Sequence, residues 1–247
     1  MKVNKYLVLA VVAVFVMALV GCRGGQSKDL SIKYDFKDTS HGWSGGFTDL
    51  PVDYDEDMYG LLLAHVTKPD NLGPGKALKL SGLNASDDLF MYLKKKLTTT
   101  DGIEANTTYL VRFTVEFATD APAGAVGIGG PPGEAVWMKV GAAPFEPVRV
   151  AQTDTPHPLW VTNVDKGHQN EDGEHAIRIG DVAKVDNDEF DVYEMKTLDN
   201  KDRPLEVTSD ANGNLWIFVG TDSGFEGRTT LYYTEIKVEL EKKPVVE

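Results

Sequence analysis

Alternating apolar and polar positions dominate the chain. Between residues 109 and 117 the odd positions hold Tyr, Val, Phe, Val and Phe, and the even positions are mostly polar. A period of two is typical of a strand with one buried face. Segments 89–97 and 231–240 alternate similarly, and the second is expected to place Tyr232, Thr234, Ile236, Val238 and Leu240 on one face. Lys95 interrupts the buried row of the first, so a helix over 87–97 is the alternative there, but the flanking threonines and aromatics favour a strand. Shorter strands are predicted at 31–36, 61–66, 77–80, 136–140, 177–179, 192–196, 205–208 and 215–219.

The pattern predicts an all-β fold. No stretch carries a sustained apolar period of 3.6 residues, and many short strands separated by glycine and proline indicate a β-sandwich or jelly roll. We expect a single domain over 30–242. The Asn212-Gly213 step predicts a hairpin between 205–208 and 215–219. Two long irregular segments, 120–133 and 142–176, interrupt the strands. Loops of this length tend to be functional when ordered, and disorder is the alternative.

The first residues are typical of an export signal. Lys2 and Lys5 precede an apolar run of 14 residues, 7–20, which is shorter than the roughly 20 that span a bilayer. The run ends in Leu19-Val20-Gly21-Cys22, which resembles the lipobox of bacterial lipoproteins. The resemblance implies a signal peptide at 1–21, acylation (diacylglycerol, palmitate) of Cys22, a lipidated tether at 22–29, and a C-terminal tail at 243–247. An uncleaved anchor and an ordinary secretory signal are the alternatives.

The lipobox resemblance implies a cellular location, and the cysteine count and net charge limit the possible chemistry and partners. By the same resemblance the protein is membrane-anchored and extracytoplasmic, on the outer membrane in a Gram-negative host because Arg23 is not aspartate. Cys22 is the only cysteine, so the mature chain has no disulfide, thiolate nucleophile or cysteine metal site. The net charge is −13, or −15 once the two lysines of the leader are removed. This excess of acid argues against nucleic acid and fits neutral glycans, cations or basic partners.

Three stretches resemble the galactose-binding-like jelly rolls, which include many carbohydrate-binding modules. They are Tyr34-Asp35-Phe36 with His41-Gly42-Trp43, then Asn106-Thr107-Thr108-Tyr109, and finally Leu215–Val219 with Tyr232-Tyr233-Thr234-Glu235-Ile236-Lys237-Val238. The resemblance implies a β-sandwich whose first and last strands hold a structural calcium. Asp35 and Glu235 would be its ligands here, and calcium is the candidate cofactor.

Two groups of residues are candidates for ligand contact. Sugar faces stack on aromatic rings, and five such residues lie in or beside irregular segments: Trp43, Tyr54, Tyr59, Trp137 and Trp160. The loop 220–227 adds Phe225 and the carboxylates of Asp222 and Glu226, which could receive sugar hydroxyls or a cation. Burial of the rings in the core and a plain hairpin loop are the alternatives.

Segment 163–175 is the most polar stretch, with two histidines, four acids and two glycines. A zinc or hard-cation site is conceivable there. The spacing of His168 and His175 matches no common zinc pattern, so a solvated loop is predicted.

These features together favour a protein that binds carbohydrate or another component of the cell envelope and has no assigned catalytic residue. A glycan hydrolase using acids such as Asp165, Asp181 or Glu226 is one alternative, and it needs two carboxyls about 5–10 Å apart in a cleft. An envelope protein that binds only other proteins is the second alternative, and it should expose a large apolar patch.

Overall fold

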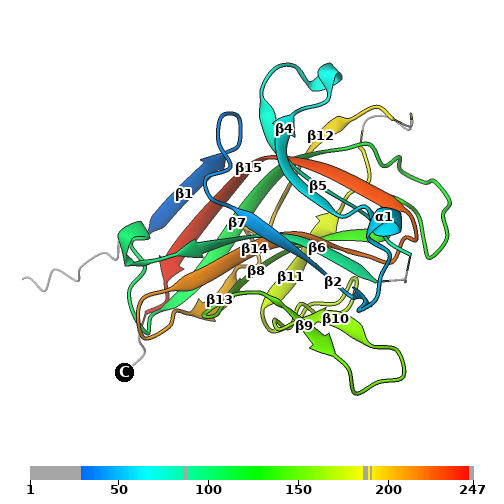
Figure 1. Ribbon diagram of the computed structural model, residues 1–247. Coiled ribbons are helices and arrows are strands. Elements are labelled where there is room, and N and C mark those ends of the chain that lie inside the picture. The colour runs from blue at the N-terminus through cyan, green and yellow to red at the C-terminus, as the bar shows by residue number, and fades with distance from the viewer. Residues whose placement is uncertain (1–28, 86–87, 186–188, 190, 245–247) are drawn as a thin grey trace, which may run out of the picture.

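The computed structural model describes residues 29–85, 88–185, 189 and 191–244, which form fifteen strands and one short α-helix (Figure 1). The strands are β1 (Leu30–Asp35), β2 (Ser44–Thr48), β3 (Leu50–Pro51), β4 (Leu62–Thr67), β5 (Lys76–Leu83), β6 (Leu89–Leu97), β7 (Thr108–Thr119), β8 (Val136–Ala143), β9 (Arg149–Gln152), β10 (Leu159–Thr162), β11 (Ala176–Asp181), β12 (Glu194–Asp199), β13 (Leu205–Thr208), β14 (Leu215–Ser223) and β15 (Arg228–Lys242). The helix is α1 (Glu56–Tyr59), and 3-10 turns lie at η1 (Asp70–Leu72) and η2 (Thr99–Asp101).

Two antiparallel sheets pack face to face. One has the order β12-β7-β15-β5-β4, with β1 on β15 and β13 on β7, and the other has the order β11-β8-β14-β6-β2. The core lies between them and takes alternate residues from both, for example Phe113 and Val238 from the first sheet and Met91 and Val219 from the second. The predicted all-β jelly-roll sandwich is confirmed, and 89–97 is a strand.

The strand 108–119 follows the predicted alternation from Tyr109 to Phe117, with every second residue buried, and Ala118 and Thr119 at its end are both buried. In β15 the prediction that Tyr232 and Thr234 share a face with Ile236 is wrong. A β-bulge between Tyr233 and Glu235 shifts the register by one residue, so Leu231 and Tyr233 are buried while Tyr232 and Thr234 lie on the outer face. A bulge inserts one extra residue and so reverses the phase of the side chains on one side of it.

The turn at 210–214 forms, but the predicted hairpin does not. The Asp210 carboxylate accepts hydrogen bonds from the backbone N–H groups of Asn212 and Asn214, and Gly213 has φ of 70°. The flanking strands belong to different sheets, because β13 pairs with β7 and β14 pairs with β6 and β8. The turn therefore carries the chain across the sandwich.

The outer face of the β11-β8-β14-β6-β2 sheet is covered by the second long segment. A three-stranded sheet, β3-β10-β9, lies beside β2, and segment 163–175 packs on β8 and β14 (Figure 1). A small apolar cluster that includes Phe90, Phe218 and Val164 fills the space beneath. This segment is thus ordered structure rather than a disordered excursion.

The expected signal peptide, Cys22 and all but the last residue of the expected tether lie outside the described residues. Within the described part of the chain, no helix has the length and the apolar character needed to cross a membrane.

Candidate functional site

The predicted aromatic residues do not gather into one exposed platform. Trp43 is only 6% exposed and packs edge-on against Tyr34, with ring centroids 5.4 Å apart. Tyr59 is 2% exposed and makes a similar contact with the half-buried Tyr54 at 5.4 Å. Trp43 and Tyr59 therefore serve the core, and their ring faces are covered.

The two remaining tryptophans among the predicted residues belong to different sheets, Trp137 to the β11-β8-β14-β6-β2 sheet and Trp160 to the β3-β10-β9 sheet. Trp137 of β8 sits opposite Asp222 in the register, beside Gly224. The guanidinium of Arg149 stacks over the ring of Trp160 in β10, with its Cζ 4.5 Å from the ring centroid. Both rings are half-buried.

The loop 220–227 does not act as one ligand-binding unit. Asp222 belongs to β14 and is fully buried, whereas Phe225 and Glu226 lie beyond the end of the strand. The loop is joined to segment 120–133 by a bridge in which the Glu226 N–H donates to the Ile128 carbonyl at 2.8 Å. Gly129 has φ of 71°, and a Cβ there would lie 2.1 Å from the Gly224 carbonyl oxygen. This close approach positions Phe225 beside the irregular segment.

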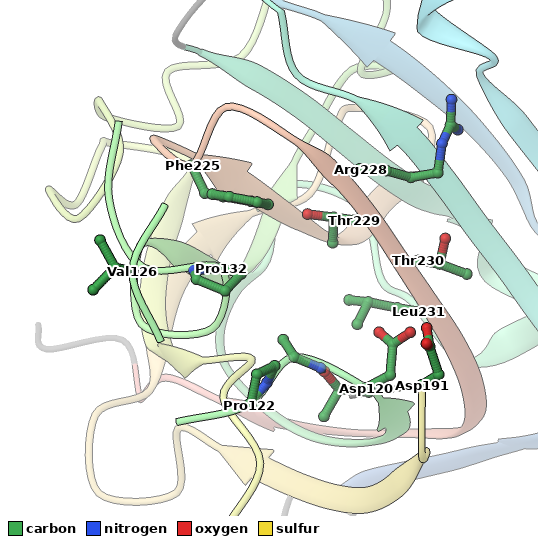
Figure 2. A pocket seen from close by; sticks show the side chains of 12 residues that line it. Asp120, Pro122, Val126, Pro132, Asp191, Phe225, Arg228, Thr229, Thr230 and Leu231 are labelled. Carbon is green, nitrogen blue, oxygen red and sulfur yellow. The ribbon is translucent and has the colours of Figure 1, made fainter. Parts of the chain in front are cut away.

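Phe225 lines a pocket of about 270 Å³ between segment 120–133 and the start of β15 (Figure 2). Its apolar wall comes from Phe225, Pro122, Pro132, Val126 and Leu231, and its polar lining comes from Thr119, Asp120, Asp191, Thr229, Thr230 and Arg228.

The polar groups of the pocket are mainly hydrogen-bond acceptors. In Figure 2, Asp120 and Asp191 lie together at one end of the cavity, opposite Phe225, and the Arg228 side chain extends away from it. Burial raises the pKa of the Asp120 carboxyl, a hydrogen bond from Tyr193 opposes that rise, and the nearby Asp191 adds to it. The arrangement offers one aromatic ring, two carboxylates and threonine hydroxyls to a ligand.

The pair Asp35 and Glu235, expected to bind calcium, is adjacent in the register of β1 and β15. Glu235 Oε2 lies 2.6 Å from Lys33 Nζ, and Asp35 accepts a hydrogen bond from the Lys37 backbone N–H. Three lysines, Lys37, Lys68 and Lys76, line the hollow beside the pair. The positive charge near these acids thus comes from lysine side chains.

A different group of acids lies under segment 163–175. Carboxylate oxygens of Asp49, Asp88 and Asp222 lie within 4.8 Å of one another. Lys166 Nζ is 2.7 Å from Asp222 Oδ2 and 3.0 Å from Asp49 Oδ2, and Lys139 Nζ is 3.1 Å from Asp222 Oδ2. The spacing of the carboxylates suits a cation, but two ammonium groups already supply the positive charge.

Burial and mutual attraction set the protonation of this cluster. Burial raises the pKa of Asp88 to about 7, although Lys166 opposes the rise, and Asp222 and Asp49 add to it. Burial lowers the pKa of Lys139 despite the attraction of Asp222. For Lys166, the three aspartates outweigh burial and raise the pKa. Three carboxylates and two ammonium groups leave one negative charge, which a proton on Asp88 removes.

The cluster holds segment 163–175 on the sheet. Lys139 Nζ also donates to the backbone carbonyls of Lys166 at 2.6 Å and Glu171 at 2.9 Å. The prediction of a solvated loop is therefore wrong for Val164 and Lys166, which are buried. The acids considered for hydrolysis have structural partners: Asp165 accepts from the N–H groups of Gly167 and Glu174, and Asp181 lies 2.9 Å from Lys196 Nζ.

Among the polar residues of the Phe225 pocket and of the buried charge cluster, the sequence indicates only Asp222 as a candidate. Asp120 and Asp191 lie about 70 positions apart in irregular segments, and Lys139 and Lys166 look like surface lysines. The one available signal was Lys139, a lysine within the predicted strand 136–140.

Neither a protein-family model nor a curated protein sequence matches this chain. Several solved β-sandwiches are similar to it in structure. A mannan-recognising carbohydrate-binding module, TmCBM27, is 10% identical, with 88% of this chain and 100% of that chain covered and a TM-score of 0.40. A second, from work on promiscuous carbohydrate-binding modules of the β-sandwich superfamily, is 15% identical, with 85% of this chain covered and a TM-score of 0.37. The chain spans 61% of the length of that protein. A module specific for non-crystalline cellulose, CBM28, is 13% identical, with 85% and 93% covered and a TM-score of 0.34.

Proposed function

We propose that this protein is a carbohydrate-binding protein of the cell envelope, held to the membrane by lipid on Cys22, and that it binds a sugar unit in the pocket lined by Phe225. The observation that supports the proposal is the pairing of an aromatic ring with two carboxylates across one small cavity.

A sugar ring has an apolar C–H face and a rim of hydroxyl groups. The Phe225 ring is suited to the face, because aromatic side chains bury a large apolar area at low conformational cost. Carboxylates accept hydrogen bonds from hydroxyl donors, and Asp120 and Asp191 provide these acceptors opposite the ring. Thr229 adds a hydroxyl that both donates and accepts, whereas the Thr230 hydroxyl is hydrogen-bonded to Ser81 Oγ at 2.7 Å.

The volume of about 270 Å³ lies just below the usual range of about 300–1,000 Å³ for small-molecule pockets. This suits one sugar unit, with the remainder of a longer glycan outside. The fully exposed side chain of Val126 stands at the pocket, where such a chain would leave.

A glycan panel tests the proposal. The full chain in detergent is screened on neutral and acidic glycans, next to Phe225→Ala, with Phe145→Ala as the matched control because Phe145 is exposed and lies outside the pocket. We expect Phe225→Ala to weaken retention about tenfold or more and Phe145→Ala to leave it unchanged. No retention on any glycan, or equal effects of the two variants, would contradict the proposal.

The lipid anchor has its own test. We expect a labelled fatty acid to be incorporated into the full-length chain in a bacterial host and Cys22→Ser to abolish incorporation. Labelling that persists in Cys22→Ser would remove the anchor from the proposal and leave the pocket unaffected.

A further inference from the structure

A second hollow, of about 350 Å³, lies between β2 and β6 of the sandwich and the start of β9. Its lining consists of Gly45, Gly46, Phe47, Tyr92, Lys94, Val148 and Arg149. It shares no residue with the Phe225 pocket.

Glycine in β2 allows Tyr92 to lie against that strand. A Cβ on Gly46 would lie 2.4 Å from the Tyr92 hydroxyl oxygen, and a Cβ on Gly45 would lie 2.6 Å from the Tyr92 carbonyl oxygen. Contacts this short do not occur between non-bonded atoms, so side chains at 45 and 46 would displace Tyr92. Gly46 thus sets the position of the Tyr92 ring at the hollow, and Gly45 allows the close approach of β2 to the Tyr92 backbone.

Two cationic side chains line the hollow, and each lies against a tryptophan ring: Arg149 against Trp160, and Lys94 Nζ at 5.6 Å from the centroid of the Trp216 ring. Arg149 forms no ion pair with any described residue, and its guanidinium is held over the Trp160 ring. Lys94 Nζ donates to Glu146 Oε1 and to the Pro147 carbonyl, both at 2.7 Å, and an ammonium group has a third donor. Lys94 is buried, so a bond from that donor forms where water competes little.

We propose that this hollow binds the carboxylate of an acidic sugar, such as a uronic acid residue. The guanidinium of Arg149 presents two parallel N–H groups that match a carboxylate, and Lys94 supplies a third donor from the floor. The Tyr92 hydroxyl donates to the Pro147 carbonyl at 3.3 Å, and the buried Tyr92 ring supports the base of the hollow. Val148 provides an apolar wall for the ring.

The charges around the hollow favour a singly charged anion. Glu146 pairs with Lys94, and a doubly charged phosphate would meet stronger repulsion from this carboxylate than a uronate would. The whole chain has a net charge of −13, so its long-range electrostatic field does not attract anions. Binding must therefore come from short contacts to Arg149 and Lys94.

Titration calorimetry of the full chain tests this site with two probes, trigalacturonate and the neutral galactotriose. Arg149→Gln removes the charge, and Arg149→Lys keeps the charge but not the paired donors. Arg178→Gln is the matched control, because Arg178 is an exposed arginine of β11 that lies outside the hollow. Every β9 residue is exposed, so the Arg149 variants are expected to fold.

We expect trigalacturonate to bind the wild type and Arg178→Gln equally, Arg149→Lys more weakly, and Arg149→Gln about tenfold or more weakly. The proposal is overturned if trigalacturonate does not bind the wild type, or if Arg149→Gln binds it as well as the wild type does.

The inference does not depend on the Phe225 pocket, and the two can fail separately. Loss of trigalacturonate binding in Arg149→Gln but not in Phe225→Ala supports the second site, whatever the first one binds. Loss in Phe225→Ala alone places the acidic sugar in the first pocket and overturns the second site.

Discussion

Replacing Asp88 by asparagine should make the protein more stable at alkaline pH. Asp88 lies beside Asp49 and Asp222, and burial with these neighbours raises its pKa to about 7. In the unfolded chain an aspartate has a pKa of about 3.9. Between these values the folded chain holds a proton that the unfolded chain has lost, so stability falls as pH rises from about 4 to about 7. Asparagine has no charge to gain in this window.

The size of the gain in stability follows from the difference between the pKa of Asp88 in the folded and in the unfolded chain. Each pKa unit is worth about 1.4 kcal/mol, so the upper limit is about 4 kcal/mol at pH 8. The Asp88 side chain is 27% exposed, and solvent reduces the repulsion that it experiences. We therefore expect a gain of about 1–3 kcal/mol at pH 8 and of less than about 1 kcal/mol at pH 4.5. Asp88 shares a side-chain hydrogen bond with Asp222, and the asparagine amide retains a donor for that bond.

Urea unfolding at pH 4.5 and pH 8 measures both values. Asp154→Asn is the control, because Asp154 is exposed in the loop between β9 and β10. A gain for Asp88→Asn that is equal at the two pH values, or a loss at pH 8, would refute the assignment of a shared proton to this cluster.

Three further substitutions test other parts of the structure. Lys166→Met leaves Asp49 and Asp222 with one cationic partner fewer, so thermal unfolding should show a loss of about 3–5 kcal/mol at pH 8; an unchanged melting temperature would contradict the buried ion pairs. Gly46→Ala forces the Tyr92 ring to move and should cost about 1–3 kcal/mol in urea unfolding, whereas a neutral result would contradict the close packing of β2 on Tyr92. Trp43→Ala opens a core cavity and should cost about 3–5 kcal/mol without changing glycan affinity per folded molecule in calorimetry; weakened affinity would restore Trp43 as a ligand contact.

The fold could be predicted because it depends on periodicity. The alternation of β7 is read directly from residues 109–117, and the sandwich follows from many such segments. The wrong predictions are those in which the pairing of strands in the folded chain differs from what the local sequence pattern indicates. The bulge near Thr234 changes which face is buried, and the turn at Asn212-Gly213 joins strands of different sheets. The residues of the strand or the turn alone determine neither the position of the bulge nor the sheet that each flanking strand joins.

The candidate site could be predicted only in part. The glycine-rich loop 220–227 indicates Phe225 as a candidate, and Phe225 lines the pocket. Asp120 and Asp191 come from distant irregular segments, and only the folded chain places them opposite that ring. Trp43 and Tyr59 share the sequence features of exposed loop aromatics, but the neighbouring strands cover them. Burial depends on these long-range contacts, which a single sequence does not display.

Hydrogen–deuterium exchange with and without a retained glycan locates the bound sugar on the chain without a substitution. If the sugar binds in the Phe225 pocket, exchange slows in 119–132 and 225–231, the segments that form most of that pocket. Slower exchange confined to other parts of the chain, with these two segments unchanged, would place the sugar elsewhere and contradict the proposed function.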